Sequence, residues 1–302
     1  MKLVSFVSRG RASWGAVTPE GIRDVGAMPG AASSLKAALP DLSAPDLSAI
    51  AAALDAAPLL PLASVSLLPP IPDPAKILCV GLNYKSHIAE TGREAPRYPM
   101  LFPRYPDSLV GSGAALVRPS ASHNFDFEGE LAVVIGKAGR HIAVADALGH
   151  VAGYACFNDG SIRDWQRHTT QFLPGKNFAH SGSFGPWLVT ADEAGDVGAL
   201  HLETRLNGEV MQRARLDDLL FPAAELIAYI STMAPLQPGD VIATGTTGGV
   251  GLFRDPPVWM KPGDTITVEI ERLGTLANTI IDEEPGIDEE PGIDEEPAIA
   301  RG

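Results

Sequence analysis

The hydrophobic positions of this chain fall mostly in short runs that alternate with polar positions and end at glycine or proline. Short, β-branched runs of this kind are typical of β-strands. From residue 76 onward they are KILCVGL (76–82), GELAVVIG (129–136), GHVAGYACFN (149–158), GPWLVT (185–190), HLETRLNG (201–208), DVIATG (240–245) and DTITVEIERLG (264–274). The same region has helical periodicity at 84–90, 161–170 and 222–233. This pattern predicts a β-rich α+β fold with its polar chemistry in the loops.

The beginning of the chain has a different texture, which predicts a small α/β layer. Two runs there alternate like short strands, KLVSFV (2–7) and WGAVT (14–18). The Ala/Leu-rich segment 33–57 predicts helix broken at Pro40 and Pro45, because proline removes a backbone donor and clashes with the preceding turn. The proline-rich segment 67–74, LLPPIPDP, reads as a stiff connector and marks the expected boundary.

We therefore expect a small N-terminal domain at 1–70, a main domain at 71–281 and an acidic tail at 282–302. The tail repeats the unit IDEEPG with a period of six residues. Its prolines and consecutive acids prevent a packed core, so we expect disorder and interpret it as a solvated extension. Metal buffering or partner binding by the tail is the alternative.

Composition narrows the class of protein. The net charge is −14, of which the tail, with nine acids and one arginine, carries more than half. An acidic chain without a basic patch argues against nucleic acid as a partner. No apolar run is long enough to span a bilayer, and the first residues lack the apolar core of a signal peptide. The two cysteines, Cys79 and Cys156, lie in apolar runs and are expected to be reduced core residues of a cytoplasmic protein.

Three carboxylates are the candidate metal ligands. Glu128 and Glu130 are two residues apart, so on a strand they leave the same face. Asp159 ends the apolar run GYACFND. Three oxygen ligands without a cysteine or a suitably spaced histidine suit a hard cation such as Mg²⁺, Mn²⁺ or Ca²⁺. The alternative is that they are surface acids on an edge strand.

Two further groups have spacings that suit catalysis. Arg163 and Gln166 follow Asp159 at helical spacing, where a guanidinium grips a substrate carboxylate. The alternative is a surface ion pair between Asp159 and Arg163. His87 and Glu90 are three residues apart, and a histidine oriented by a carboxylate is a usable general base. Solvent-exposed helices also contain this pair by chance.

Two loops carry candidate anion-binding groups. Lys176 lies in LPGKNF, where its ammonium can pair with an anionic intermediate. The segment 243–251, ATGTTGGVG, follows a strand and offers backbone amides and Thr246 to an oxyanion or carboxylate. It lacks the order of glycines and lysine of a phosphate-binding P-loop.

In their order along the chain, these motifs resemble the fumarylacetoacetate hydrolase family over about 76–281. The motifs are GLNYKSHIAE, DFEGELAVVIGK, AGYACFNDGSIRDWQ, GKNF, GDVIATGTTGGVG and PGDTITVEIERLG. The resemblance implies a mixed β-roll around a metal site, often in a homodimer. Two departures stand out: Thr247 and Gly248 replace the proline and alanine of the family's T-G-T-P-A-G-V-G loop. In addition, Arg104 stands where many relatives carry lysine.

The resemblance also implies roles for the candidate residues. The implied metal ligands are Glu128, Glu130 and Asp159, usually for Mg²⁺ or Mn²⁺. The implied catalytic residues are His87 and Glu90, on a lid over bound substrate, and Lys176. The implied substrate-contacting residues are Arg163, Gln166 and Thr246.

Several reactions are open to such a site, because they share a metal-stabilised enolate. The leading prediction is hydrolysis of a C–C bond in an acylpyruvate-type or fumarylpyruvate-type 2-oxo acid, in aromatic catabolism, with water activated by His87 and Glu90. The alternative is an isomerase or decarboxylase of a 2-hydroxyhepta-2,4-dienedioate type of substrate, or an oxaloacetate decarboxylase. A sugar-acid dehydratase and a catalytically silent binding protein are further possibilities.

Overall fold

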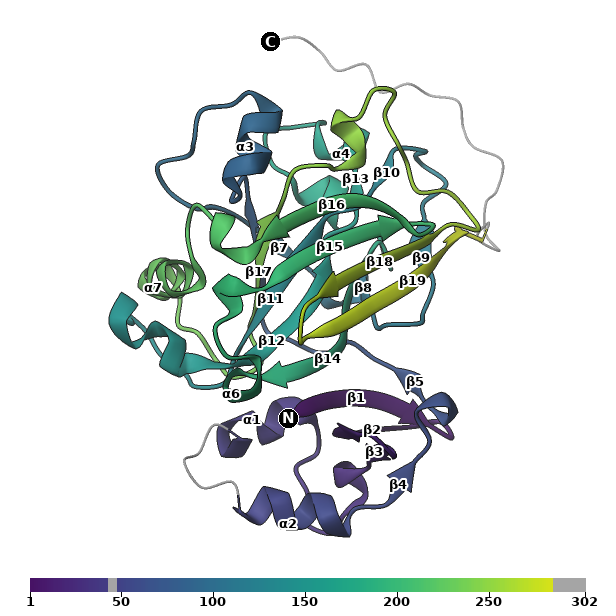
Figure 1. Cartoon of the computed structure of the whole chain (residues 1–302), viewed down its shortest axis with the longest axis vertical. Helices are drawn as coiled ribbons and strands as arrows, with labels where there is room; N and C mark the ends of the chain where they lie inside the picture. Colours follow the sequence, from purple (N-terminus) through teal and green to yellow (C-terminus); the bar gives the residue numbers. More distant parts are fainter. Residues whose placement is uncertain (43–47, 285–302) are drawn as a thin grey trace, which may run out of the picture.

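A computed structural model describes residues 1–42 and 48–284 of the chain (Figure 1). Its main feature is a large mixed sheet, whose strands pair in the order β4 (Leu59–Leu60), β3 (Gly21–Arg23), β2 (Arg11–Thr18), β1 (Lys2–Ser8), β14 (Gly182–Thr190), β12 (Val151–Asn158), β11 (Gly129–Ile135), β17 (Val241–Thr246), β6 (Ile77–Gly81) and β7 (Met100–Arg104). Two short strands extend it: β5 (Ser66–Leu67) pairs with β1, and β8 (Leu109–Val110) pairs with β14.

Strand β11 lies near the middle of this sheet and is buried along its whole length. Leu131 and Val133 point into one apolar cluster, and Ala132 and Val134 point into another on the opposite face. Successive strand residues alternate between faces, so burial on both faces requires the continuous apolar run that the sequence has here. The central strand is therefore held from both sides, which makes its end a rigid support for side chains.

A second sheet covers one face of the first (Figure 1). Its order is β16 (Glu209–Arg215), β15 (His201–Leu206), β18 (Thr265–Ile270), β19 (Gly274–Asp282) and β9 (Leu116–Arg118). Leu202, Val268 and Leu276 of this sheet share a buried cluster with Leu131 and Val133 of β11. The two sheets thus enclose the main core, and the fold is the β-rich α+β arrangement that the sequence predicts.

The helices lie around the sheets and at the connections between strands. They are α1 (Leu35–Leu42), α2 (Ser48–Ala56), α3 (Lys85–Thr91), α4 (Arg163–Gln166), α5 (Leu173–Lys176), α6 (Ala191–Ala194) and α7 (Ala223–Met233). The stretch 161–170, predicted as one helix, begins instead as strand β13 (Ser161–Ile162), paired with β10 (Phe125–Asp126), and is helical only at α4. Pro40 lies inside α1 near its end, although the sequence predicts a break there.

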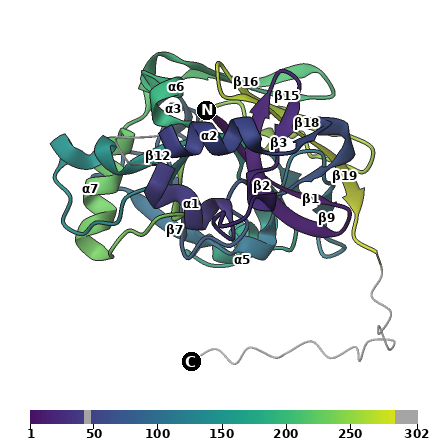
Figure 2. The same ribbon diagram turned by 90° about the horizontal axis from the view of Figure 1, so that it is seen from below.

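The N-terminal strands continue the main sheet, so the sheet runs through both parts of the chain. Lys2 and Leu3 of β1 pair with Val189 and Leu188 of β14. The N-terminal elements form a layer at the foot of Figure 1, and Figure 2 shows it from below. The division at residue 70 stays a prediction.

At the other end of the chain, Asp282 ends β19, and the predicted tail lies outside the described residues from 285 onward. Among the described residues, no helix is both long and apolar enough to cross a bilayer.

Candidate active site

Three buried carboxylates meet where β11 begins and β12 ends. Glu128 immediately precedes β11, Glu130 lies in it and Asp159 follows β12. A backbone hydrogen bond joins the two segments at this point: the N–H of Asp159 donates to the carbonyl of Glu128 at 2.9 Å. One carboxylate oxygen from each residue lies within 4.8 Å of the other two. The predicted ligands therefore form one cluster, and none of the three is a surface acid.

Local packing fixes where the two glutamates point. Gly129 between them faces the second sheet, where an added Cβ would lie 2.0 Å from Thr204 Oγ1. Any larger residue here would have to displace the side chain of Thr204. The side-chain oxygen of Asn158 accepts a hydrogen bond from the N–H of Glu128 at 3.0 Å. As a result, the backbone between the two acids is held on both sides.

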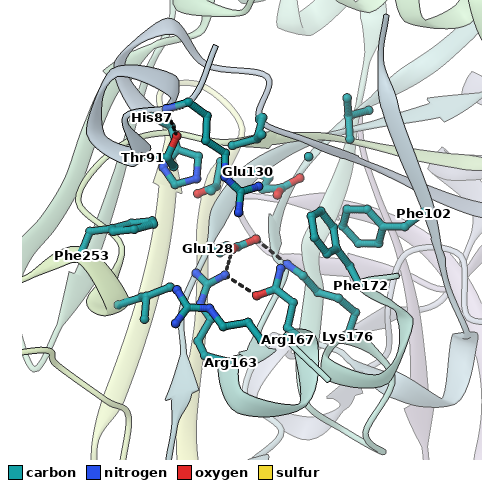
Figure 3. A pocket seen from close by; sticks show the side chains of 17 residues that line it. His87, Thr91, Phe102, Glu128, Glu130, Arg163, Arg167, Phe172, Lys176 and Phe253 are labelled. Carbon is teal, nitrogen blue, oxygen red and sulfur yellow. Dashed lines mark hydrogen bonds and ion pairs between the residues drawn. The ribbon is translucent and has the colours of Figure 1, made fainter. Parts of the chain in front are cut away.

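Lys176, at the end of α5, lies against two of these acids, and Figure 3 shows its contact with Glu128. Its Nζ contacts Glu128 Oε2 and Asp159 Oδ2, both at 2.6 Å. Burial raises the pKa of Glu128, but Arg163 and Lys176 outweigh this effect and lower that pKa to about 2. Burial also disfavours the charged form of Lys176, yet Asp159 and Glu128 raise its pKa above the usual value. Glu128 and Lys176 are therefore both charged at neutral pH.

Glu130 has the opposite electrostatic environment. Its Oε2 accepts one hydrogen bond, from the N–H of Gly245 at 2.8 Å. Burial, followed by the charges of Asp159 and Glu128, raises its pKa well above the usual value. A buried carboxylate beside two others needs a proton or a cation. The cluster consists of oxygen donors only, which fits a hard divalent cation.

Arg163, at the start of α4, is held by acids other than the one the sequence suggested. Its Nε donates to Asp126 Oδ2 at 2.7 Å, and its Nη1 contacts Glu128 Oε1 at 2.6 Å and Gln166 Oε1 at 2.9 Å. An ion pair between Asp159 and Arg163 is thus not what positions it. Its Nη2 is buried and has no hydrogen-bond partner among the described residues. This donor is therefore unsatisfied in the structure.

His87 lies on α3 with its ring buried against Phe253, 6.0 Å between ring centroids. Its Nδ1 is 2.9 Å from Glu90 Oε2. The other oxygen of Glu90 accepts from the N–H of Gly249 at 2.8 Å. Glu90 therefore both orients the histidine and ties α3 to the 243–251 loop.

Thr246, the last residue of β17, lies opposite Glu130 of β11, and its hydroxyl already forms hydrogen bonds. It donates to the carbonyl of Gly129 at 3.1 Å and accepts from Gln212 Nε2 at 2.8 Å. Gln212 also accepts from the N–H of Gly129 through its side-chain oxygen at 2.9 Å. The hydroxyl of Thr246 holds the strand that carries Glu130, and Gln212 does the same from β16, although no motif in the sequence pointed to Gln212.

One pocket brings most of the predicted site residues together (Figure 3). Of the nine, seven line it: His87, Glu128, Glu130, Arg163, Gln166, Lys176 and Thr246. The other two, Glu90 and Asp159, contact members of that set. Phe102 and Phe172 form one side of the pocket, and Phe253 lies opposite them.

Four charged residues around the site were not predicted to take part. Arg93 and Arg167 line the pocket and are exposed. Asp126 is fully buried; it holds Arg163 and accepts from the N–H groups of Gly251 and Leu252. Arg104, which the sequence analysis noted only as a departure, is buried behind Asp159. The sequence offers one indication that Asp126 takes part: it lies two residues before Glu128, as Glu128 lies two residues before Glu130.

The chain matches a known family model and known proteins. The model of the fumarylacetoacetate (FAA) hydrolase C-terminal domain matches residues 76–281. Oxaloacetate tautomerase FAHD2A, mitochondrial, from Homo sapiens is 44% identical over 226 residues, which are 74% of this chain and 72% of that protein.

Solved structures agree with the family match. A fumarylacetoacetate hydrolase from Exiguobacterium antarcticum has a TM-score of 0.82 at 36% identity, covering 94% of this chain and all of that one. Maleylpyruvate hydrolase from Sphingobium sp., solved with manganese(II) and pyruvate, has a TM-score of 0.79 at 30% identity with the same coverage. These matches confirm the resemblance inferred from the motifs: the chain belongs to the fumarylacetoacetate hydrolase family.

Proposed function

We propose that this chain is a divalent-metal-dependent isomerase that interconverts the keto and enol forms of a small 2-oxo dicarboxylic acid of the oxaloacetate type. The observation that carries the proposal is the buried, unpartnered Nη2 of Arg163, which belongs to a residue that lines the same pocket as the acid cluster and His87. A guanidinium donor suits a substrate carboxylate, and a cation site and a base beside it suit the enolisation of a 2-oxo acid. The human relative named an oxaloacetate tautomerase supports the same reaction.

The charges around the pocket suit an anionic substrate. The free N–H of Arg163 supplies a donor for one carboxylate, because the rest of its guanidinium is fixed by Asp126, Glu128 and Gln166. Arg93 and Arg167 line the pocket and are exposed, so they are available to a second carboxylate. This arrangement favours a dicarboxylate over a monocarboxylate.

Glu128, Glu130 and Asp159 are the residues that would hold a divalent ion, which we propose to be Mg²⁺ or Mn²⁺. When bound, the ion would supply Lewis-acid stabilisation of the negative charge that develops on the 2-oxo oxygen. Lys176 holds Glu128 and Asp159 in place through its 2.6 Å contacts. Its position beside these acids also lets its ammonium stabilise an anionic substrate oxygen.

His87 is the residue that moves the proton. If Nδ1 donates to Glu90, Nε2 carries a lone pair and acts as the base. In the keto-to-enol direction Nε2 takes the proton from C3, the C–H electrons form the C2–C3 double bond, and the C2–O π electrons move onto the oxygen. The resulting enolate oxygen takes a proton from water, and the imidazolium gives its proton back to water, so that the base is neutral again. The protonated imidazole, stabilised by Glu90, returns a proton in the reverse direction.

The proposal is tested by a product assay on the full chain with Mg²⁺ present and with excess chelator. The substrates are enol oxaloacetate, an acylpyruvate, maleylpyruvate and a hydroxyhepta-dienedioate. We expect metal-dependent ketonisation of oxaloacetate without loss of CO₂ and without C–C cleavage. Full activity in chelator, or turnover of the acylpyruvate alone, would contradict it.

Hydrolysis of a C–C bond, the leading prediction from the sequence, is the second candidate. The pair of His87 and Glu90 favours it, because the same nitrogen that accepts a carbon-bound proton can activate water. The maleylpyruvate hydrolase from Sphingobium sp. is a structural neighbour with that activity in its name. Decarboxylation of oxaloacetate also fits the site, and the same assay separates the three reactions by their products.

A further inference from the structure

Arg104, the last residue of β7, is fully buried behind the acid cluster and does not line the pocket. All five of its N–H donors have acceptors. Nε donates to Ser108 Oγ (3.1 Å), Nη1 to Asp159 Oδ1 (2.6 Å) and Gly160 O (3.0 Å), and Nη2 to Ser108 O (3.3 Å) and Ser181 Oγ (2.9 Å). A guanidinium satisfied in this way has one orientation, so it holds its acid in one orientation too.

The two oxygens of Asp159 consequently have different surroundings. Oδ1 is held by Arg104. Oδ2 contacts Lys176 Nζ, and the same ammonium contacts Glu128. Oδ2 therefore faces the other carboxylates, whereas Oδ1 faces the guanidinium behind them.

We propose that Arg104 is a positioning residue that fixes Asp159 as a one-oxygen ligand and thereby makes the site select Mg²⁺ or Mn²⁺ over Ca²⁺. This inference rests on the metal-dependent function proposed above and adds to it a residue that decides which ion is bound. Mg²⁺ takes near-ideal octahedral coordination with short bonds, to which each carboxylate gives one oxygen. Ca²⁺ accepts six to eight oxygens and takes carboxylates in the bidentate form.

Lysine at this position would not do the same work. An ammonium has three donors and no fixed plane, so it leaves at least two of the present acceptors without a partner and lets the carboxylate of Asp159 rotate. A rotated Asp159 can present both oxygens to the cluster, which is the geometry that Ca²⁺ accepts.

The backbone beside Arg104 is adapted to the guanidinium. An added Cβ on Gly182, the first residue of β14, would lie 2.6 Å from Arg104 Nη2 and 2.8 Å from its Cζ. Glycine at this position therefore leaves the space that the planar group occupies. Arg104 and Gly182 are therefore matched in this chain, the first supplying the guanidinium and the second the space for it.

The test is calorimetric titration of the metal-free full chain with MgCl₂ and with CaCl₂, which measures the ratio of the two Kd values. Wild type is expected to bind Mg²⁺ more tightly than Ca²⁺. Arg104→Lys is expected to lose about tenfold or more in Mg²⁺ affinity while Ca²⁺ affinity changes little, so the preference for Mg²⁺ shrinks by about tenfold. If Arg104 were needed only for folding, Arg104→Lys would weaken the binding of both ions equally.

Two further variants make the result decisive. Arg118→Lys, the same change in an arginine that pairs with Asp282 instead, is the matched control and should leave the ratio unchanged. Ser181→Ala removes one acceptor from Arg104 but keeps its charge, so it should shift the ratio in the same direction by a smaller amount, which covers the case in which Arg104→Lys does not fold.

The outcomes separate this inference from the function on which it rests. An unchanged ratio in folded Arg104→Lys, or in Ser181→Ala where Arg104→Lys does not fold, overturns the role of Arg104 and leaves the metal-dependent function intact. Equal binding of Ca²⁺ and Mg²⁺ by wild type also overturns the selectivity alone. Absence of binding of both ions to wild type overturns the metal-dependent function and this inference together.

Discussion

Glu130 is the carboxylate of the site that forms no ion pair within the described part of the chain, although Lys176 lies near enough to lower its pKa against the larger opposing effects. The buried acids Asp126, Glu128 and Asp159 each contact a guanidinium or an ammonium, whereas Glu130 accepts a hydrogen bond from the amide of Gly245 and, in residues 1–42 and 48–284, from no side chain. A buried carboxylate that lies beside other carboxylates and forms no ion pair is stabilised by a proton or by a metal ion. In this protein Glu130 is therefore the group whose protonation competes most directly with metal binding.

This competition gives a pH prediction. The pKa of Glu130 is raised well above its usual value, first by burial and then by Asp159 and Glu128. The ionised carboxylate binds the metal, so metal affinity should increase as pH rises through that pKa, and binding below it should release a proton. Calorimetry of Mg²⁺ binding in buffers of different ionisation enthalpy measures both effects. An affinity that is independent of pH, with no proton released, would contradict this prediction.

His87 should act on the substrate and not on the metal. It contacts Glu90 and Phe253 and makes no hydrogen bond to the acid cluster among the described residues. His87→Gln is therefore expected to lower kcat by about 100-fold or more, the usual range for a general base, while the Kd for Mg²⁺ changes less than about twofold. His201→Gln, in an exposed histidine paired with Glu271, is the matched control. Comparable losses in kcat and in metal affinity would show that His87 supports the metal site instead.

The chemistry of single residues was predictable where it depends on local spacing. Two glutamates two residues apart, ahead of an apolar run, indicate ligands that leave one strand face, and His87 with Glu90 indicates an oriented base. Partners that are distant along the chain were not predictable in this way. Arg104 lies 55 residues before Asp159, and Gln212 lies 34 residues before Thr246, so only the folded sheet brings them together.

Among the strands, one with a strong continuous apolar run was predicted well, whereas one with a mixed polar sequence was not. The central strand β11 matches its prediction closely because both of its faces are buried. Strand β16 was missed, since its sequence EVMQRAR does not alternate: its two buried residues, Met211 and Gln212, are adjacent, and exposed charged residues lie on both sides of them. The helix predicted at 161–170 is short, because Ser161 and Ile162 pair with β10 and the residues from Arg167 onward are exposed.

The close contact between β11 and β15 gives a prediction about stability. In Gly129→Ala the new Cβ would press on Thr204 Oγ1, so we expect the free energy of unfolding in urea to fall by about 1–3 kcal/mol and Mg²⁺ binding to weaken. Adding Thr204→Ala removes the atom in conflict and should restore part of both losses. Gly149→Ala, where nothing lies within 4 Å of the added Cβ, is the control. A Gly129→Ala variant as stable as wild type would show that the contact is not close.

The whole chain has one continuous sheet from its first residues to the acid cluster. Strand β1 pairs with β14, β14 pairs with β12, and Asp159 follows β12. The N-terminal layer thus supports the same strands that carry the site.

The homodimer and the cytoplasmic location stay predictions, and the human relative carries the word mitochondrial in its name. Sedimentation of the full chain measures the first of these two properties.

The acidic repeat should be dispensable for activity. Asp282 and Glu283 contact Arg118 and Ser120, so they belong to the folded part, and a truncation should keep them. We expect a chain that ends at Glu284 to have the kcat, KM and thermal midpoint of the full chain. A large drop in kcat of the truncated protein would show that the repeat takes part in the active assembly.

The most direct test of the proposed chemistry is exchange of the C3 hydrogens of oxaloacetate with solvent deuterium, followed by NMR in D₂O at a saturating Mg²⁺ concentration. We predict rapid exchange with wild type and exchange reduced to the uncatalysed rate by His87→Gln or by chelator, with the carbon skeleton intact. Exchange by wild type no faster than in buffer, or exchange that persists in excess chelator, would contradict metal-dependent enolisation at this site.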